Sequence, residues 1–120
     1  MSDPKVKLER NAKRMIKKEH VIWLTTVDSE GKPQPRPVWF IWDNDSFLIF
    51  SQPKAHKLKH IKHNDNVSLH FNSDETGEKN VIVYIGKAVL DGNTPPANKV
   101  PAYLRKYRKA LSKNKLLNLS

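Results

Sequence analysis

The chain has no cysteine, only four glycines and no long apolar run. Without cysteine there is no disulfide, no thiolate nucleophile and no cysteine-ligated metal. The apolar stretches fall well short of the ~20 residues that a membrane-spanning helix needs. The N-terminus is charged and lacks the apolar centre of a signal peptide. We therefore expect a cytoplasmic protein with no membrane partner.

Acidic residues are also scarce, because 12 Asp and Glu stand against 22 Lys and Arg, for a net charge of +10. Such an excess suits either a polyanion such as nucleic acid or a small phosphorylated ligand. Much of the charge lies in the two terminal segments, where helical spacing makes a solvated face the usual explanation. We do not expect a nucleic-acid partner, although single-stranded nucleic-acid binding stays an alternative.

The length of 120 residues predicts one domain with one core. The apolar spacing predicts helices over 4–19, 53–63 and 100–111, and strands over 20–27, 33–42, 46–50, 67–71 and 80–90. The predicted parts are an N-terminal helix (1–19), a barrel (20–90), a C-terminal helix (100–111) and a tail (112–120). Short antiparallel strands with flanking helices indicate a mainly β protein, a small β-barrel.

Two local signals support this pattern near the first hairpin. Gly31 follows Asp28-Ser29-Glu30 and suits a turn that needs a positive φ. Pro33, Pro35 and Pro37 alternate at the start of the second strand. Because proline has no N–H to donate, this stretch is predicted to be either the edge of a sheet or the entry to a strand.

The stretch PVWFIWDNDSFLIFSQPKAHK, residues 37–57, is the most informative. Its second strand ends at Phe50, and helical spacing begins at Ser51-Gln52-Pro53, which places Lys54 and Lys57 in the first turns. A helix start has free N–H groups and a partial positive charge, so it attracts anions. The pattern predicts a bound phosphate and hence a phosphorylated cofactor. The alternative is an ordinary serine cap beside solvated lysines.

Three histidines, His56, His60 and His63, share one face of the predicted crossing helix. Their spacing is compatible with zinc or haem. No carboxylate accompanies them, and they lie among lysines, so an exposed basic face is the interpretation that we favour. We predict no metal site, and the role of these histidines stays open.

The run LTTVDSEGKPQPRPVWFIWDNDSFLIFSQPKAHKLKHIKHNDNVSLHF, followed by VIVYIGKAVL, resembles the pyridoxamine-5′-phosphate-oxidase-like split-barrel family of flavin and deazaflavin proteins. PVWFIW…SFLIFSQP…K is most similar to its F420-dependent branch. The resemblance covers about residues 18–90. It implies an antiparallel, Greek-key-like, six-stranded FMN-binding split barrel. It also implies a homodimer whose inter-subunit groove holds FMN, or F420 as the alternative.

The resemblance also implies site residues. In the oxidase branch an arginine, a hydroxyl residue and a lysine hold the cofactor phosphate, and Arg36, Ser51 and Lys57 occupy the matching positions. Ile41, Phe50 and His56 stand where that branch has lysine, tyrosine and arginine, which argues against pyridoxamine phosphate oxidation itself. No residue clearly matches the ring-binding glutamine, and Asn80 is only nearby. The candidate cofactor-binding set is Arg36, Phe50, Ser51, Gln52, Lys54, Lys57 and Asn80.

The implied function is a flavin- or deazaflavin-dependent oxidoreductase that transfers hydride to or from a small organic substrate. The sequence identifies neither the substrate nor a catalytic residue. After Tyr107, KALSKNKLLNLS does not resemble the strand with which relatives complete the barrel, so we expect truncation or divergence there. A non-enzymatic module that carries a cofactor or haem, or binds single-stranded nucleic acid, is the alternative function.

Overall fold

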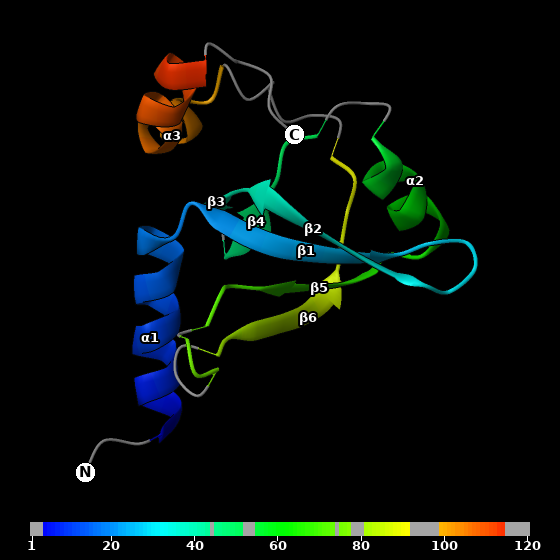
Figure 1. Cartoon of the computed structure of the whole chain (residues 1–120), viewed down its shortest axis with the longest axis horizontal. Helices are drawn as coiled ribbons and strands as arrows, with labels where there is room; N and C mark the ends of the chain where they lie inside the picture. The colour runs from blue at the N-terminus through cyan, green and yellow to red at the C-terminus, as the bar shows by residue number, and fades with distance from the viewer. Residues whose placement is uncertain are drawn as a thin grey trace.

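The computed structural model describes residues 4–43, 45–51, 55–73, 75–77, 81–91 and 99–114, with side chains between residues 10 and 108. Its elements are shown in Figure 1 and follow in this order: α1 (Pro4–Lys18), β1 (Val21–Val27), β2 (Pro33–Trp39), β3 (Ile41–Asp43), β4 (Ser46–Leu48), α2 (His56–His63), β5 (Asn66–His70), β6 (Val83–Lys87) and α3 (Pro101–Asn114). No helix in these ranges has the length and apolar character to cross a bilayer.

Two antiparallel sheets make up the β structure. The larger has the strand order β2-β1-β5-β6, and the smaller joins β3 to β4. β1 and β2 form a hairpin whose turn contains Gly31 at φ 80, as the sequence predicts. Within the described residues, strand pairing does not close the two sheets into one cylinder. The mainly β, antiparallel architecture with flanking helices is confirmed.

β2 lies at the edge of the larger sheet, which is one of the two positions that its prolines predict. Pro33, Pro35 and Pro37 all pair with β1, and β2 has no strand on its other side in the described part of the chain. A strand with three residues that cannot donate a backbone hydrogen bond is tolerated where no neighbouring strand has to be bonded on one of its sides. The prolines therefore place β2 outermost.

The prediction of one strand over residues 33–42 is wrong. β2 ends at Trp39, β3 begins at Ile41, and the two belong to different sheets. Phe40 lies between them, and its N–H donates to the Tyr107 hydroxyl of α3 at 2.8 Å. The chain turns here because α3 takes the backbone groups that a continuous strand would use. β6 is also shorter than the predicted 80–90 strand.

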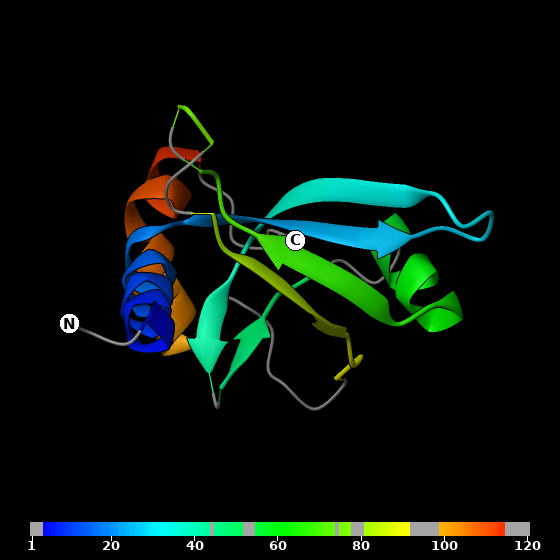
Figure 2. The same ribbon diagram turned by 90° about the horizontal axis from the view of Figure 1, so that it is seen from below.

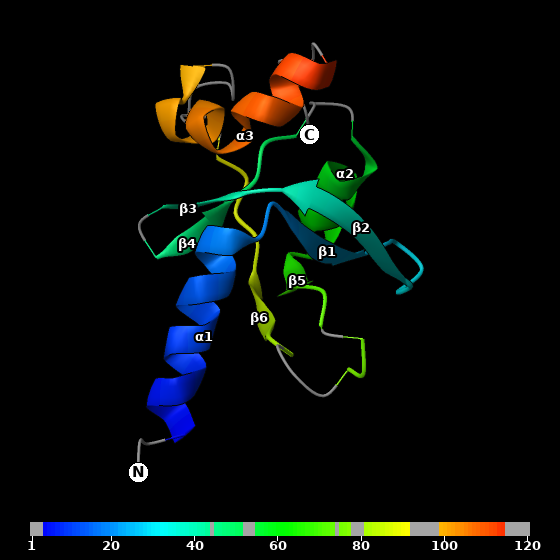
Figure 3. The same ribbon diagram turned by 60° about the vertical axis from the view of Figure 1, so that its left-hand side comes forward.

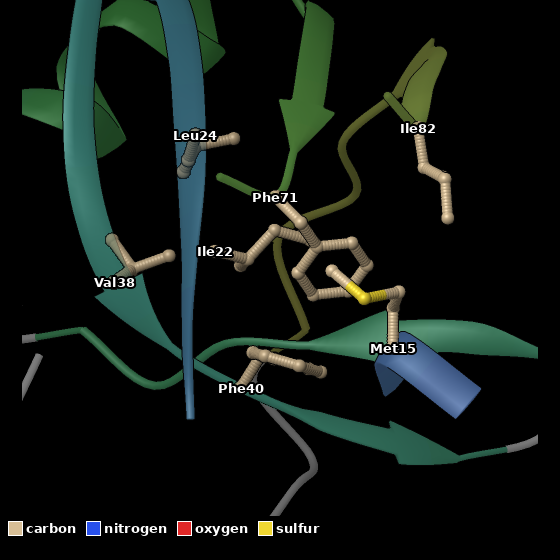
Figure 4. Close-up of a cluster of buried hydrophobic side chains, with 7 residues drawn as sticks. All are labelled: Met15, Ile22, Leu24, Val38, Phe40, Phe71 and Ile82. Atoms are coloured by element: carbon tan, nitrogen blue, oxygen red, sulfur yellow. The ribbon is translucent and has the colours of Figure 1, made fainter. Parts of the chain in front are cut away.

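The main core lies between the inner face of the larger sheet and α1. In β1, Ile22, Leu24 and Thr26 are buried and alternate with half-exposed neighbours, so they define the inner face. Figure 4 shows the buried cluster closing around the Phe71 ring, with Met15 reaching in from α1. Its members are Met15, Ile22, Leu24, Val38, Phe40, Phe71 and Ile82.

A second, smaller cluster forms where α3 meets β3. It is built on Ile41, Tyr103 and Tyr107, with Trp39 and Phe50 packed against it. Figure 2 shows α1 and α3 together at one end of the larger sheet and α2 at the other end. In Figure 3 the β3–β4 pair lies between α3 and α1. The protein thus has an α3 end and an α2 end, and the segment from β4 to α2 connects them.

Candidate functional site

α2 begins later than predicted. Its N-cap is Ala55, which makes no side-chain capping hydrogen bond, and the first helical residue is His56. Ser51 therefore does not cap this helix, and the prediction that the helix starts at residues 51–53 is wrong. The sequence does not mark this start, because Ala55 fits the helical spacing of the residues that follow it and is not a typical capping residue. The methyl side chain of Ala55 offers the first N–H groups of α2 no acceptor, and helix-start N–H groups attract anions.

Lys57 lies in the first turn of α2 and is half-buried. Desolvation lowers the pKa of its ammonium below the ordinary value. The ion pairs in the described part of the chain join Lys32 to Glu30 and Lys87 to Asp65, so none neutralises Lys57. A partly desolvated cation without a counter-ion is unfavourable. A bound anion would supply the missing charge.

α2 is held on the inner sheet face by a contact between His60 and β1. His60 Nδ1 lies 2.9 Å from the Thr26 hydroxyl, and Thr26 is buried. His56 and His63 are exposed. The described residues contain no group of three or more potential metal ligands. His60 therefore has a structural role, which fixes where Lys57 lies relative to the sheet.

Arg36 reaches the same face from β2. Arg36 pairs with Leu24 of β1. Two residues along β1 on the same face, Thr26 pairs with Gln34, and Thr26 is the residue that contacts α2. Opposite residues of an antiparallel pair point to the same face. Arg36 is exposed, and its guanidinium donates to the Pro35 carbonyl at 2.7 Å. The register thus places Arg36 and α2 over one end of the same face.

Phe50 and Ser51 lie between β4 and α2, and both are half-buried. The Phe50 ring meets Tyr103 of α3 edge-on, with centroids 4.9 Å apart. Phe50 therefore faces the α3 end rather than α2. The remaining candidates, Gln52, Lys54 and Asn80, lie outside the described residues. Of the predicted set, the structure brings Arg36 and Lys57 to the same end of one face and ties Phe50 to α3.

The residues that the sequence analysis missed are on α3. The Tyr107 hydroxyl accepts the Phe40 N–H and lies 2.7 Å from the His20 carbonyl and 2.9 Å from the Phe40 carbonyl. Its ring stacks on Trp39 at 4.2 Å, and α3 bends at Tyr107, where φ is −108°. Tyr103 lies one turn earlier and is equally buried. The sequence feature that could have identified them is the pair of tyrosines spaced one turn apart on this basic helix.

Lys106 lies between these tyrosines and is paired within the chain. Its ammonium donates to the Phe40 carbonyl at 2.9 Å and sits 3.4 Å from the centroid of the Phe40 ring. Desolvation lowers the pKa of Lys106 to about 8. Burial raises the pKa of Tyr103 to about 12 and that of Tyr107 still further. The neutral tyrosines and the paired lysine act as an anchor for α3.

A cavity of about 320 Å³ opens at the β5–β6 end of the larger sheet. Its lining includes His70, whose ring stacks on Trp23 of β1 with centroids 6.3 Å apart. The Trp23 indole N–H donates to Asn72 at 3.0 Å. The rest of the lining is mixed: Phe71, Val81, Ile82 and Val83 are apolar, and Asn72, Ser73 and Gly77 complete it. The cavity offers an imidazole beside an apolar wall.

The comparison with known sequences gives two findings. The family model described as "Pyridoxamine 5'-phosphate oxidase" matches residues 8–115. The pyridoxine/pyridoxamine 5′-phosphate oxidase of Vibrio parahaemolyticus is 34% identical over 65 residues. That match covers 53% of this chain and 31% of the oxidase, so the chain spans about a third of its curated relative.

Solved structures show the same fold. An F420 reductase matches with a TM-score of 0.61 and 23% identity, over 81% of this chain and 74% of the reductase. HutZ, the haem storage protein of Vibrio cholerae, matches with a TM-score of 0.58 and 16% identity, over 88% of this chain and 75% of HutZ. At these identities the likeness is one of fold, and the fold is the split barrel. The family match, which extends over most of the chain, shows that this protein belongs to the pyridoxamine 5′-phosphate oxidase family.

Proposed function

We propose that this protein binds a phosphorylated flavin-type cofactor, FMN or F420, with its phosphate at the start of α2. The observation that carries the proposal is Lys57, a half-buried cation with a lowered pKa and no ion-pair partner among the described residues. The first N–H groups of α2, to which the side chain of Ala55 offers no acceptor, lie beside it. Arg36 belongs to the same end of the sheet face. These groups suit an ester phosphate.

The chain's residues would bind and orient the cofactor rather than react with it. Lys57 and the α2 N–H groups would hold the phosphate, Arg36 would add attraction from β2, and Ser51 would contribute from the β4–α2 segment. The bound cofactor would supply hydride transfer to or from a small organic substrate. Membership of an oxidase family and the fold shared with an F420 reductase support this assignment.

The first test is the absorption spectrum of freshly purified protein, followed by titration with FMN and with F420. We expect one of the two to bind, with a flavin or deazaflavin band that stays with the protein through gel filtration. Absence of binding to both would refute the proposal. Reduction of the bound cofactor by candidate substrates would then separate an oxidoreductase from a carrier.

We also propose that the protein is a homodimer. On the outer side of β6, Val83 is 57% exposed and Ile85 is 87% exposed, and Val81 continues this apolar stripe at 54%. A contiguous exposed apolar stripe on an edge strand commonly marks a protein interface. Ile85→Lys should convert the dimer to a monomer in analytical ultracentrifugation, and Ser29→Lys, on the distant exposed turn, should not. A wild-type monomer would contradict this part of the proposal.

A haem carrier is the second candidate, and His70 favours it. This imidazole lines the cavity at the β5–β6 end beside four apolar side chains, with Asn72 and Ser73 also in the lining, and an imidazole is a common haem ligand. HutZ, which shares the fold, is a haem storage protein. A Soret band that is lost in His70→Ala would support this function. Stoichiometric flavin binding without a Soret band would exclude it.

A further inference from the structure

The C-terminal helix contacts the segment that carries Ser51. Tyr103 of α3 is 1% exposed, and its ring meets the Phe50 ring edge-on, with centroids 4.9 Å apart and planes at 77°. The buried Tyr103 hydroxyl has no hydrogen-bond partner in the described structure. The hydroxyl therefore does not explain the position of this ring. What Tyr103 provides is packing against Phe50, Tyr107 and Trp39.

α3 is itself anchored independently of this contact. Tyr107 bonds to the backbone of Phe40 and His20, and Lys106 donates to the Phe40 carbonyl. These bonds fix α3 to the junction between β2 and β3, which is part of the sheet framework. Tyr103 lies one turn before Tyr107 on the same helix, so the bonds that fix α3 also fix the position of Tyr103. The Phe50 ring is thus held by a rigid support.

We propose that Tyr103 is a positioning residue for the phosphate end of the site: by holding Phe50, it fixes where the next residue, Ser51, is presented. The inference rests on the proposed cofactor site. Phe50 and Ser51 are bonded neighbours, so a shift of the ring moves the Ser51 backbone and hydroxyl. A preorganised loop loses less entropy on binding than one that must be ordered by the ligand. α3 would therefore raise cofactor affinity without touching the cofactor.

The test compares three variants at a temperature where all are folded. Tyr103→Ala should bind the cofactor about tenfold more weakly than wild type, because the loop must then be ordered on binding. Tyr103→Phe keeps the ring and loses only the unpartnered hydroxyl, so it should bind like wild type. Met15→Ala removes a buried side chain from the main core, which does not contain Phe50, and should lower the melting temperature without changing affinity.

Hydrogen exchange gives a readout that does not need the cofactor. Tyr103→Ala should accelerate amide exchange at Phe50 and Ser51, and Met15→Ala should not. If Tyr103→Ala fails to fold, Tyr103→Leu, which keeps most of the volume but not the ring edge, takes its place. Equal affinity and equal exchange in wild type and in these Tyr103 variants would overturn the inference. A wild-type protein that binds neither FMN nor F420 would refute the proposed function instead, and exchange at Ser51 would still decide whether Tyr103 holds the loop.

Discussion

Two half-buried lysines at opposite ends of this protein have contrasting surroundings. Lys106, on α3, donates to the Phe40 carbonyl and lies over the Phe40 ring. Lys57, at the start of α2, has no such partner among the described residues. Desolvation lowers the pKa of both ammonium groups. Burial of a cation therefore does not by itself identify a binding site. Lys57 is the more informative of the two, because no described residue offers its partly desolvated ammonium an ion pair.

At the α3 end, loss of the Tyr107 hydroxyl should have the largest effect on the stability of the protein. Tyr107→Phe removes the hydroxyl that accepts the Phe40 N–H and leaves that buried donor without a partner. We expect a loss of about 2 kcal/mol in the free energy of unfolding, or roughly 8 °C in the melting temperature. Thermal denaturation followed by circular dichroism measures it. The matched Tyr103→Phe variant, whose hydroxyl has no partner, should change stability by less than ~0.5 kcal/mol. Equal losses in both variants would contradict the assigned roles.

The next effect concerns Lys57. Lys57→Ala should weaken cofactor binding by about 1–3 kcal/mol, since a charge-assisted hydrogen bond to the phosphate is lost. Lys59→Ala serves as the control because Lys59 is on the same helix but exposed, and it should bind almost as wild type does. Isothermal titration calorimetry measures both. If the two variants behave alike, general electrostatic attraction rather than a specific site accounts for binding.

A smaller effect should appear in the pH dependence of stability. The pKa of Lys106 is about 8 in the folded chain and 10.5 ordinarily. Between these values the unfolded chain keeps a proton that the folded chain has released, so stability should rise with pH from about 8 towards 10. Because Lys106 is partly exposed, solvent screening reduces the rise to the order of 1 kcal/mol.

Above pH 10 the tyrosines act in the opposite direction. Their raised pKa values mean that the unfolded chain loses protons that the folded chain keeps, so stability should fall. Urea denaturation between pH 7 and pH 11 measures the whole profile. Lys106→Met should flatten the rise below pH 10 and leave the fall above it. A rise of the same size in this variant would show that other lysines are responsible.

The smallest effect should come from Arg36. It is exposed and already donates to the Pro35 carbonyl. Arg36→Ala should therefore weaken cofactor binding by less than ~1 kcal/mol, and high salt should remove most of that difference. Titrations at low and high salt measure it. A salt-independent loss as large as that of Lys57→Ala would mean that Arg36 moves into direct contact with the phosphate on binding.

Local signals in the sequence predicted much of the fold. The Gly31 turn, the β1–β2 hairpin and the edge position of β2 follow from glycine and proline chemistry within a few residues. The break at Phe40 could not be predicted in this way. It depends on Tyr107, which lies 67 positions along the chain. Strand propensity at Phe40 is real, but the distant hydroxyl competes for the same backbone N–H and prevails.

The cofactor-binding residues remain a prediction, and the sequence indicated little of their geometry. Residue type and spacing pointed to Lys57, and the family resemblance pointed to Arg36; the structure places Arg36 and α2, which carries Lys57, over one end of the inner face. The start of α2 was missed because Ala55 provides no capping signal. The absence of a counter-ion at Lys57 depends on where every carboxylate of the described chain lies in space. No local pattern carries that information, and the same holds for the contact between Tyr103 and Phe50.

The proposed function requires that the start of α2 holds the phosphate of the cofactor. The most direct test compares FMN with riboflavin, or F420 with its phosphate-free deazaflavin riboside, in wild type and in Lys57→Ala. The phosphorylated form should bind wild type at least about tenfold more tightly than its phosphate-free counterpart, and Lys57→Ala should remove most of that preference. Equal affinity of wild type for both forms, or a phosphate preference that survives in Lys57→Ala, would contradict the account.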